Sequence, residues 1–105
     1  MSLSFEISEL AQADLERIWN YTAINWSSVQ ADKYYKELIA QIETICKNPE
    51  IGRSIAYIKN QHQKVNFFSH MIIYKVVNKV IFIDRILHKR MDIESNLGEN
   101  NPTLK

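Results

Sequence analysis

The chain has 105 residues, 46% of them hydrophobic and 24% charged, a composition typical of a single globular domain rather than a disordered segment. Thirteen basic residues against twelve acidic ones leave a formal net charge of +1, so bulk charge cannot coat nucleic acid and any such contact must come from local clustering. The single cysteine, Cys46, excludes an internal disulfide.

The amino-terminal sequence MSLSFEISEL shows neither a basic leader nor a long apolar segment. No run in the chain reaches the roughly 18 apolar residues that a membrane span needs. We therefore expect a cytoplasmic protein without membrane contact.

A short strand opens the chain, because Leu3, Phe5 and Ile7 alternate with polar residues at the period of two that is typical of a half-buried strand. Ser8 can cap a helix that follows. Apolar residues then recur at helical spacing to about Asn25, which predicts a first helix over this stretch.

A second helix is predicted to begin near Ser27, because Ser27 and Gln30 have the spacing of a capping box. A broad apolar face follows, and Asn48 with Pro49 ends the helix. Since only a residue or two separates the helices, they must fold back as an antiparallel hairpin whose apolar face needs a sheet to lie on.

Three strands are predicted after a connecting loop over residues 50–60. Alternation at 65–67 indicates a second strand. The runs 71–77 and 80–87 are rich in β-branched residues, and an Asn-Lys pair at 78–79 joins them as a two-residue turn. These two runs should form a hairpin of central strands.

The order of elements, β-α-α-β-β-β, predicts an α+β fold in which a helical hairpin packs on a small, mainly antiparallel sheet. One domain is expected over residues 1–97, followed by a polar, flexible tail at 98–105. The polar composition from Glu94 onward predicts that the chain is already frayed there, or ordered only by a partner.

Several segments resemble the ParE branch of the ParE/RelE toxin superfamily: DLERIWNYTAINW at 14–26, NPEIGR at 48–53, SHMIIYKV at 69–76 and RILHKRMD at 85–92. With the order of elements, the resemblance covers residues 5–97. It implies a RelE/ParE-like fold and a toxin of a bacterial type II toxin–antitoxin pair. It further implies a hetero-oligomer with a ParD-like antitoxin, whose carboxy-terminal segment wraps the toxin, and inhibition of DNA gyrase by binding, without a reaction of the toxin's own.

The sister RelE branch instead cuts messenger RNA in the ribosome, which requires a base, an acid and cations for the developing phosphorane charge. Candidate parts for such a site are Lys64, Arg85, His88 and Arg90, with His70 as a weaker one. Nothing aromatic follows Phe82, so the carboxy-terminal tyrosine or histidine–tyrosine pair of many nucleases in that branch is missing. The sequence thus favours a non-enzymatic gyrase poison over the alternative, a ribosome-dependent mRNA endonuclease. A third interpretation is a degenerate member of the toxin family that is no longer toxic and is kept only as a binding or regulatory partner.

The strand end RILHKRMD is the predicted target-binding surface, because its charged side chains leave the sheet together. The predicted target-binding residues are Arg85, His88, Lys89, Arg90, Met91 and Asp92. The simpler alternatives are a solvated strand end and, for His88, a structural hydrogen bond rather than a general base.

The guanidinium of Arg85 lies within an otherwise apolar strand, so it needs a partner unless it faces an open groove. The carboxylates considered for Arg85 are Asp84, Asp92 and Glu6.

The aromatic residues of the helices are assigned to the core and to an antitoxin groove, because their helical spacing is typical of packing rather than of a platform for bases. The predicted antitoxin-binding residues are Trp19, Tyr21 and Tyr34. No metal is expected, since three histidines and scattered carboxylates lack ligand spacing, and no cofactor, since two glycines cannot build a phosphate loop. His62, alone in the loop, is assigned no role.

Overall fold

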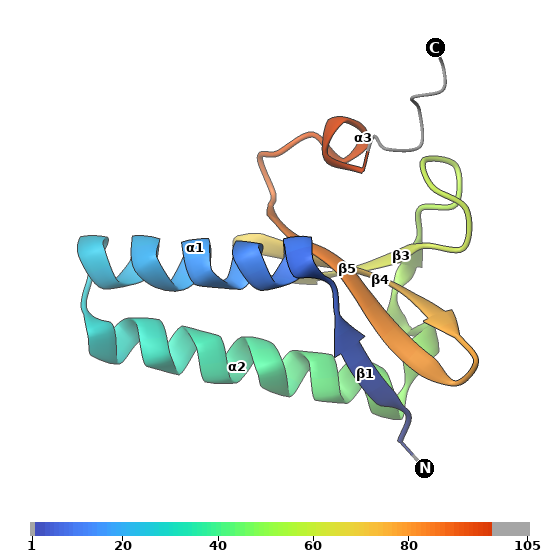
Figure 1. Cartoon of the computed structure of the whole chain (residues 1–105), viewed down its shortest axis with the longest axis horizontal. Coiled ribbons are helices and arrows are strands. Elements are labelled where there is room, and N and C mark those ends of the chain that lie inside the picture. Colours follow the sequence, from blue (N-terminus) through green and yellow to red (C-terminus); the bar gives the residue numbers. More distant parts are fainter. Residues whose placement is uncertain (1, 98–105) are drawn as a thin grey trace.

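The computed structural model describes residues 2–97, and the tail predicted at 98–105 lies outside the described residues. The elements are β1 (Ser4–Ile7), α1 (Glu9–Asn25), α2 (Ser28–Lys47), the 3-10 helix η1 (Pro49–Ile51), β2 (Arg53–Ser54), β3 (Gln63–Phe67), β4 (His70–Val77), β5 (Val80–His88) and α3 (Ile93–Asn96). The predicted α+β class, with a helical hairpin on a sheet, is confirmed (Figure 1).

The sheet has the strand order β1-β5-β4-β3-β2 over the described residues. Each neighbouring pair is antiparallel except β1 and β5, which run parallel. The mainly antiparallel sheet that the sequence predicts is therefore confirmed. The first and last strands in sequence, β1 and β5, lie side by side, so the sheet is complete only when β5 is present (Figure 1).

Serine side chains start both long helices. The Ser8 hydroxyl accepts a hydrogen bond from the Ala11 N–H at 2.9 Å, and the Ser27 hydroxyl accepts one from the Gln30 N–H at 3.0 Å. Each bond satisfies an amide that would otherwise lack a partner in the first turn. The predicted capping positions are confirmed, and α1 and α2 run side by side and project beyond the sheet (Figure 1).

Apolar side chains are buried on both faces of the sheet. The hairpin covers one face, where α1 and α2 pack against alternating residues of the strands. The buried residues of this larger cluster include Leu15, Leu38, Ile42, Ile45, Val65, Ile72, Tyr74, Ile81, Ile83 and Ile86. The opposite face carries a smaller cluster of Ile55, Met71, Ile73, Leu87 and Leu97. Two covered faces explain why β4 and β5 read as nearly continuous apolar runs.

Residues 94–97 are ordered, so the prediction of a frayed chain from Glu94 onward was wrong for this part. Asp92 caps α3 by accepting from the Ser95 N–H, and Leu97 is only 1% exposed. Ile93 and Leu97 are four residues apart and share one helix face that packs on the smaller cluster. The apolar pair and the Asp92 cap, together with the hydrogen bond from Arg85 to the Asn96 carbonyl, hold this short helix despite its polar neighbours.

The loop predicted over residues 50–60 contains structure that the sequence pattern did not reveal, namely η1 and β2. The buried Tyr74 hydroxyl donates to the Pro49 carbonyl at 2.6 Å and accepts from the Gly52 N–H at 3.1 Å. A side chain at position 52 would collide with this hydroxyl, so only glycine allows the close approach. The Tyr74 hydroxyl thus holds the NPEIGR turn, residues 48–53, against the sheet.

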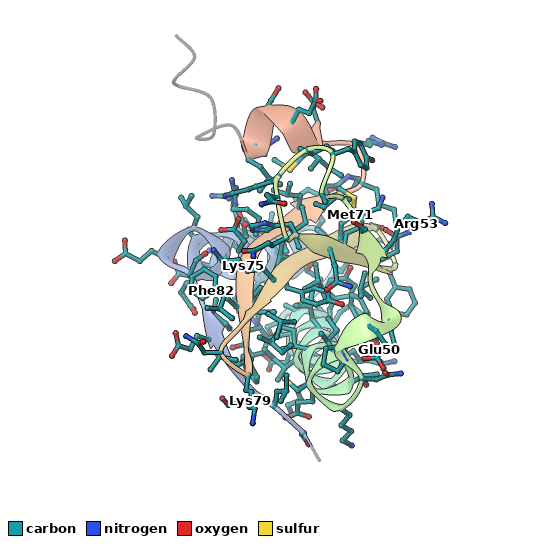
Figure 2. The ribbon with its side chains drawn as sticks, turned by 90° about the vertical axis from the view of Figure 1, so that its right-hand side faces the viewer. Glu50, Arg53, Met71, Lys75, Lys79 and Phe82 are labelled. Carbon is teal, nitrogen blue, oxygen red and sulfur yellow. The ribbon has the colours of Figure 1, made fainter. Side chains whose placement is uncertain are left out.

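A β-bulge interrupts the central hairpin. Ile73 pairs with Arg85, whereas the next residue, Tyr74, pairs with Ile83, so Asp84 is the extra residue on β5. On the turn side of the bulge, Lys75 lies beside Phe82, with its Nζ 5.5 Å from the ring centroid (Figure 2). The bulge changes which β5 side chains face each side of the sheet, and the candidate site depends on this change.

Candidate binding groove and basic tip

A groove of about 930 Å³ opens between α1, the start of α2 and the ends of β4 and β5. Its apolar lining is contributed by Ile18, Tyr21, Trp26, Tyr34, Ile86 and Met91. Its polar lining includes Asp14, Arg17, Gln30, His70, His88 and Arg90. The groove therefore combines an apolar wall with a largely basic rim, and it is assembled from elements far apart in sequence.

Asp14 and Arg85 form a buried ion pair at the base of this groove. Asp14 is 2% exposed, and its Oδ2 accepts from Arg85 Nε at 2.8 Å while its Oδ1 accepts from Arg85 Nη2 at 2.9 Å. The same Oδ2 accepts from the Ile86 backbone N–H at 2.9 Å. Since β1 pairs with β5 only as far as Ile83, this amide lies on a strand edge without a neighbouring strand, and Asp14 satisfies it.

The partners predicted for Arg85 were wrong, because the ion pair is made with Asp14 of α1 and not with Asp84, Asp92 or Glu6. The guanidinium also donates from Nη1 to the Asn96 carbonyl at 3.0 Å. Arg85 is 11% exposed and links α1, β5 and α3. It is a structural clamp beneath the groove, so it offers little surface to a target.

Tyr34, His70 and His88 form an aromatic cluster on the groove wall. The Tyr34 hydroxyl lies 2.7 Å from His70 Nδ1, and the two histidine rings, paired across β4 and β5, have centroids 5.3 Å apart. Burial, with the nearby His88, lowers the pKa of His70 to about 4, and burial raises the pKa of Tyr34. Both shifts move these groups away from neutrality, where a general acid or base works best.

The candidate nuclease residues do not converge on one point. His88 and Arg90 line the groove, whereas Arg85 is held by Asp14 beneath it. Lys64 lies on β3, does not line the groove, and its Nζ is 3.9 Å from Met71 Sδ. The arrangement does not place base, acid and cations around a common reacting atom.

A second surface, which we call the basic tip, consists of Phe68, Ser69, Lys89 and Arg90 at the end of the sheet. The Lys89 N–H donates to the Ser69 carbonyl at 2.8 Å, which joins the β3–β4 turn to the residues after β5. The Arg90 N–H donates to His88 Nδ1 at 3.0 Å, so the unprotonated Nδ1 holds the turn. The Lys89 and Arg90 side chains are exposed.

The other predicted target-binding residues divide into two kinds. Met91 is 39% exposed and lines the groove beside Arg90. Asp92 is engaged as the cap of α3, where its Oδ2 also accepts from the Ser95 hydroxyl at 2.6 Å, and these bonds lower the pKa of Asp92. Of the six predicted residues, His88, Lys89, Arg90 and Met91 therefore remain candidates for contact, while Arg85 and Asp92 hold the structure.

The predicted antitoxin-binding residues also divide. Tyr21 and Tyr34 line the groove. Trp19 does not, because its indole N–H donates to Asp32 Oδ1 at 2.9 Å and ties α1 to α2. Sequence reasoning missed Arg17 and Trp26 as lining residues, although the four-residue spacing of Arg17 and Tyr21 places them on one helix face.

A further polar cluster lies around Asp84, the bulge residue. His62, assigned no role from the sequence, is 2% exposed, with Nε2 3.1 Å from Asp84 Oδ2 and Nδ1 2.8 Å from the Asn60 carbonyl. Lys59 Nζ lies 3.1 Å from the same carboxylate oxygen. The hydrogen bond from His62, supported by Lys59, lowers the pKa of Asp84 to about 2. The cluster fastens the loop before β3 to β5, and no local sequence signal indicates it.

Within residues 2–97, no group of three or more histidine, cysteine, aspartate and glutamate side chains is arranged to bind a metal. The helices in the same part of the chain are also too short or too polar to cross a membrane.

Comparison with known proteins agrees with this arrangement. Residues 5–93 match the family model described as the ParE toxin of the type II toxin–antitoxin system parDE. The chain belongs to the ParE toxin family. It is 39% identical to a protein named Toxin ParE1 from Mycobacterium tuberculosis, over 92% of this chain and all of the relative. It is 34% identical to Toxin ParE1 from Caulobacter vibrioides, over 90% of this chain and 97% of that protein.

Solved structures of the ParE and RelE branches share the fold. A chain of the chromosomal ParDE system from P. aeruginosa superposes with a TM-score of 0.72 at 18% identity, covering 83% of this chain and 96% of that one. A chain of the RelBE2 toxin–antitoxin complex from Mycobacterium tuberculosis gives a TM-score of 0.66 at 10% identity, covering 85% and 100%. The fold is common to both branches, so it does not by itself distinguish a ParE toxin from a RelE toxin.

Proposed function

We propose that this toxin of a type II system acts in the cytoplasm by binding and poisoning DNA gyrase, without bond-breaking chemistry of its own. The observation that supports the proposal most is the exposed basic tip, which borders the groove through Arg90. The tip presents cations to a macromolecule, while the shifted pKa values of His70 and Tyr34 on the adjoining groove wall lie away from neutrality, where a general acid or base works best.

A ParD-like antitoxin is the proposed occupant of the groove. Tyr21 is 66% exposed and Trp26 is 75% exposed. Large exposed apolar side chains of this kind, close together on one surface, are typical of a site that binds another protein. The rim adds Arg17 and Arg90, so an amphipathic helix with acidic residues on one flank fits this lining. Such a helix covers Arg90 and Met91, and the antitoxin then neutralises the toxin by occluding its target-binding surface.

The test places two assays side by side. The purified toxin should inhibit gyrase supercoiling and accumulate cleaved DNA, while transcripts on translating ribosomes stay intact. Transcript cleavage without gyrase inhibition would refute the proposal.

The occlusion mechanism is tested with Arg90→Glu. Reversing this charge should weaken both gyrase inhibition and the binding of an acidic antitoxin segment, by tenfold or more, since it replaces attraction with repulsion at two surfaces. Lys36→Glu, an exposed charge reversal on α2 outside the groove, is the matched control and should leave both unchanged. An Arg90→Glu toxin that loses only one of the two activities would show that antitoxin and target do not share this residue.

Ribosome-dependent mRNA cleavage is retained as the second candidate because of one contact. The Tyr34 hydroxyl beside His70 Nδ1 restores, from a different element, the tyrosine–histidine pair that the carboxy-terminal sequence lacks. In this case Tyr34→Phe should abolish transcript cleavage while the variant stays folded, as urea unfolding would show. Absence of cleavage by the unmodified toxin removes this candidate.

A further inference from the structure

Phe68 occupies a backbone position that normally belongs to glycine. It is the first of two residues connecting β3 and β4, and its φ is +50°, in the left-handed region. A bulky side chain in this region is a true outlier, and glycine is the usual residue at such hairpin positions. Its side chain is also 68% exposed, so burial in the core does not account for its presence. Strained backbone of this kind is concentrated where a protein binds something.

The exposed ring of Phe68 is held rather than free. Its centroid lies 4.8 Å from that of Phe67, with the two rings nearly perpendicular, and 6.1 Å from that of Tyr34. These contacts support one side of the ring and leave the rest open to solvent. A supported aromatic ring can accept a stacking partner with little further loss of conformational entropy.

The charge around Phe68 is positive. Lys89 is joined to the Phe68 turn by the hydrogen bond from its N–H to the Ser69 carbonyl, and Arg90 follows it. No ion pair engages either side chain among residues 2–97. Two nearby carboxylates are already bonded, Asp14 to Arg85 and Arg17, and Asp92 to Ser95. Glu37 of α2 is the acidic residue on the other side of the turn, where it adds to the effect of burial in raising the pKa of Tyr34. The tip is thus a local cluster of cations in a chain whose net charge is only +1.

We propose that the basic tip binds DNA in which bases are unstacked or exposed, with Phe68 stacking on a base and Lys89 and Arg90 contacting phosphates. A supported aromatic ring on a turn that is hydrogen-bonded to a segment with two exposed cations is the combination that binds single-stranded nucleic acid with little sequence preference. A pocket of a protein with acidic residues at its edge would accept the same ring and cations, and the cross-linking experiment below distinguishes it from DNA. Resting on the proposed function, the inference identifies the DNA strands that gyrase holds open as part of the target.

The first experiment measures binding of the free toxin to a fluorescent DNA duplex with a single-stranded gap, without gyrase. Phe68→Trp and Phe68→Leu are compared because all three residues meet the same backbone strain, so the comparison isolates the aromatic face. Phe68→Leu should weaken binding by about tenfold to a hundredfold, while Phe68→Trp retains it. Lys89→Ala should make the affinity less dependent on salt: the slope of log binding constant against log salt concentration should fall by about the amount expected for one phosphate contact.

The controls are Tyr57→Leu, an aromatic residue that is 81% exposed in the loop before β3, and Lys36→Ala on α2. Both should bind the gapped duplex like the unmodified toxin. Urea unfolding of each variant confirms that it is folded. Equal affinity of the Phe68→Leu variant, or no salt-dependent binding of the gapped duplex by the unmodified toxin, would overturn the proposal.

The second experiment places a photo-reactive benzoyl-phenylalanine at position 68 and illuminates the toxin with gyrase and DNA. Cross-links to DNA support the proposal, and cross-links to a gyrase subunit alone overturn it.

The proposed gyrase poisoning and the proposed DNA contact of Phe68 can be refuted separately. A toxin that binds gapped DNA through Phe68 but leaves supercoiling unaffected refutes gyrase poisoning and retains the DNA contact. A toxin that poisons gyrase equally with leucine at position 68 refutes the contact and retains gyrase poisoning.

Discussion

At the scale of single residues, the most consequential side chain is that of Asp14, for which the sequence analysis predicted no role. Asp14 instead is buried and bonded to Arg85 and to the Ile86 amide, 71 and 72 residues away along the chain. The sequence showed correctly that Arg85 needs a partner. It could not show which one, because the choice depends on how far β1 extends along β5.

Replacing Asp14 with alanine should lower the free energy of unfolding by about 3 to 5 kcal/mol, because it leaves a mostly buried guanidinium without its counter-charge. The double variant Asp14→Ala with Arg85→Met should recover part of this loss, since it removes the uncompensated charge. Urea unfolding measures both. Arg17→Ala is the control, because Arg17 is the exposed partner of Asp14 and should cost about 0.5 kcal/mol.

Acid should weaken the cluster at the bulge. The pKa of Asp84 is lowered to about 2, so its ionised form is favoured in the folded state by His62 and Lys59. The resulting stability is present above about pH 4 and is lost as the pH falls from about 4 to about 2. The free energies of unfolding of the unmodified toxin and of Asp84→Asn should differ by on the order of 1 to 2 kcal/mol near neutral pH. This difference should vanish as the pH approaches about 2.

Urea unfolding across this pH range checks the prediction. Glu16→Gln, a change at an exposed carboxylate on α1, is the matched control and should show no such convergence with the unmodified toxin. A difference for Asp84→Asn that stays constant down to the lowest pH would mean that the charge of Asp84 does not contribute to folding.

At the scale of elements, a periodic apolar pattern decided what could be predicted. The two long helices and the strands β1, β3, β4 and β5 carry periodic apolar patterns or capping residues, and the sequence located each of them to within a few residues. The elements that were missed, η1, β2 and α3, contain two to four residues each and, unlike the equally short β1, were not recognised from an apolar pattern. They exist because of distant contacts, such as those of Tyr74 with the turn at 49–52.

Leu97 tests whether α3 is an integral element. Leu97→Ala should lower the free energy of unfolding by about 2 to 5 kcal/mol, because the side chain is buried in the smaller cluster and its loss leaves a cavity. Glu94→Ala, an exposed change in the same helix, is the control and should have little effect. Thermal unfolding monitored by circular dichroism compares the two. Equal stability of both variants would indicate that α3 detaches in solution.

At the scale of the whole molecule, the candidate site could be predicted only in part. The strand end at 88–91 was identified because charge follows an apolar strand directly, which is a local signal. The groove beside it was predicted only on the helix side, through Tyr21 and Tyr34, because four elements build its walls and their relative placement follows from the sheet order. Phe68 was also missed, since nothing in the pattern shows that the turn at 68–69 has a positive φ at its first residue.

The far end of the helical hairpin exposes apolar side chains together. They are Tyr21, Ile24, Trp26 and Val29, each between 66% and 83% exposed. We expect the free toxin to self-associate through this surface more readily than the antitoxin complex does. Ile24→Glu should reduce self-association in sedimentation or light scattering, whereas Tyr57→Glu, at an equally exposed site on the sheet side, should not. Equal self-association of the free toxin and the complex would contradict this.

The parallel pairing of β1 with β5 bears on when the protein becomes active during its synthesis. The strand that completes the larger apolar cluster ends at His88, so the chain must have emerged from the ribosome as far as this residue before the hairpin has a complete sheet to cover. Translation itself thus delays the toxin's activity. An antitoxin already present in the cell can meet the emerging helices before the basic tip, which needs β5 to exist, has formed.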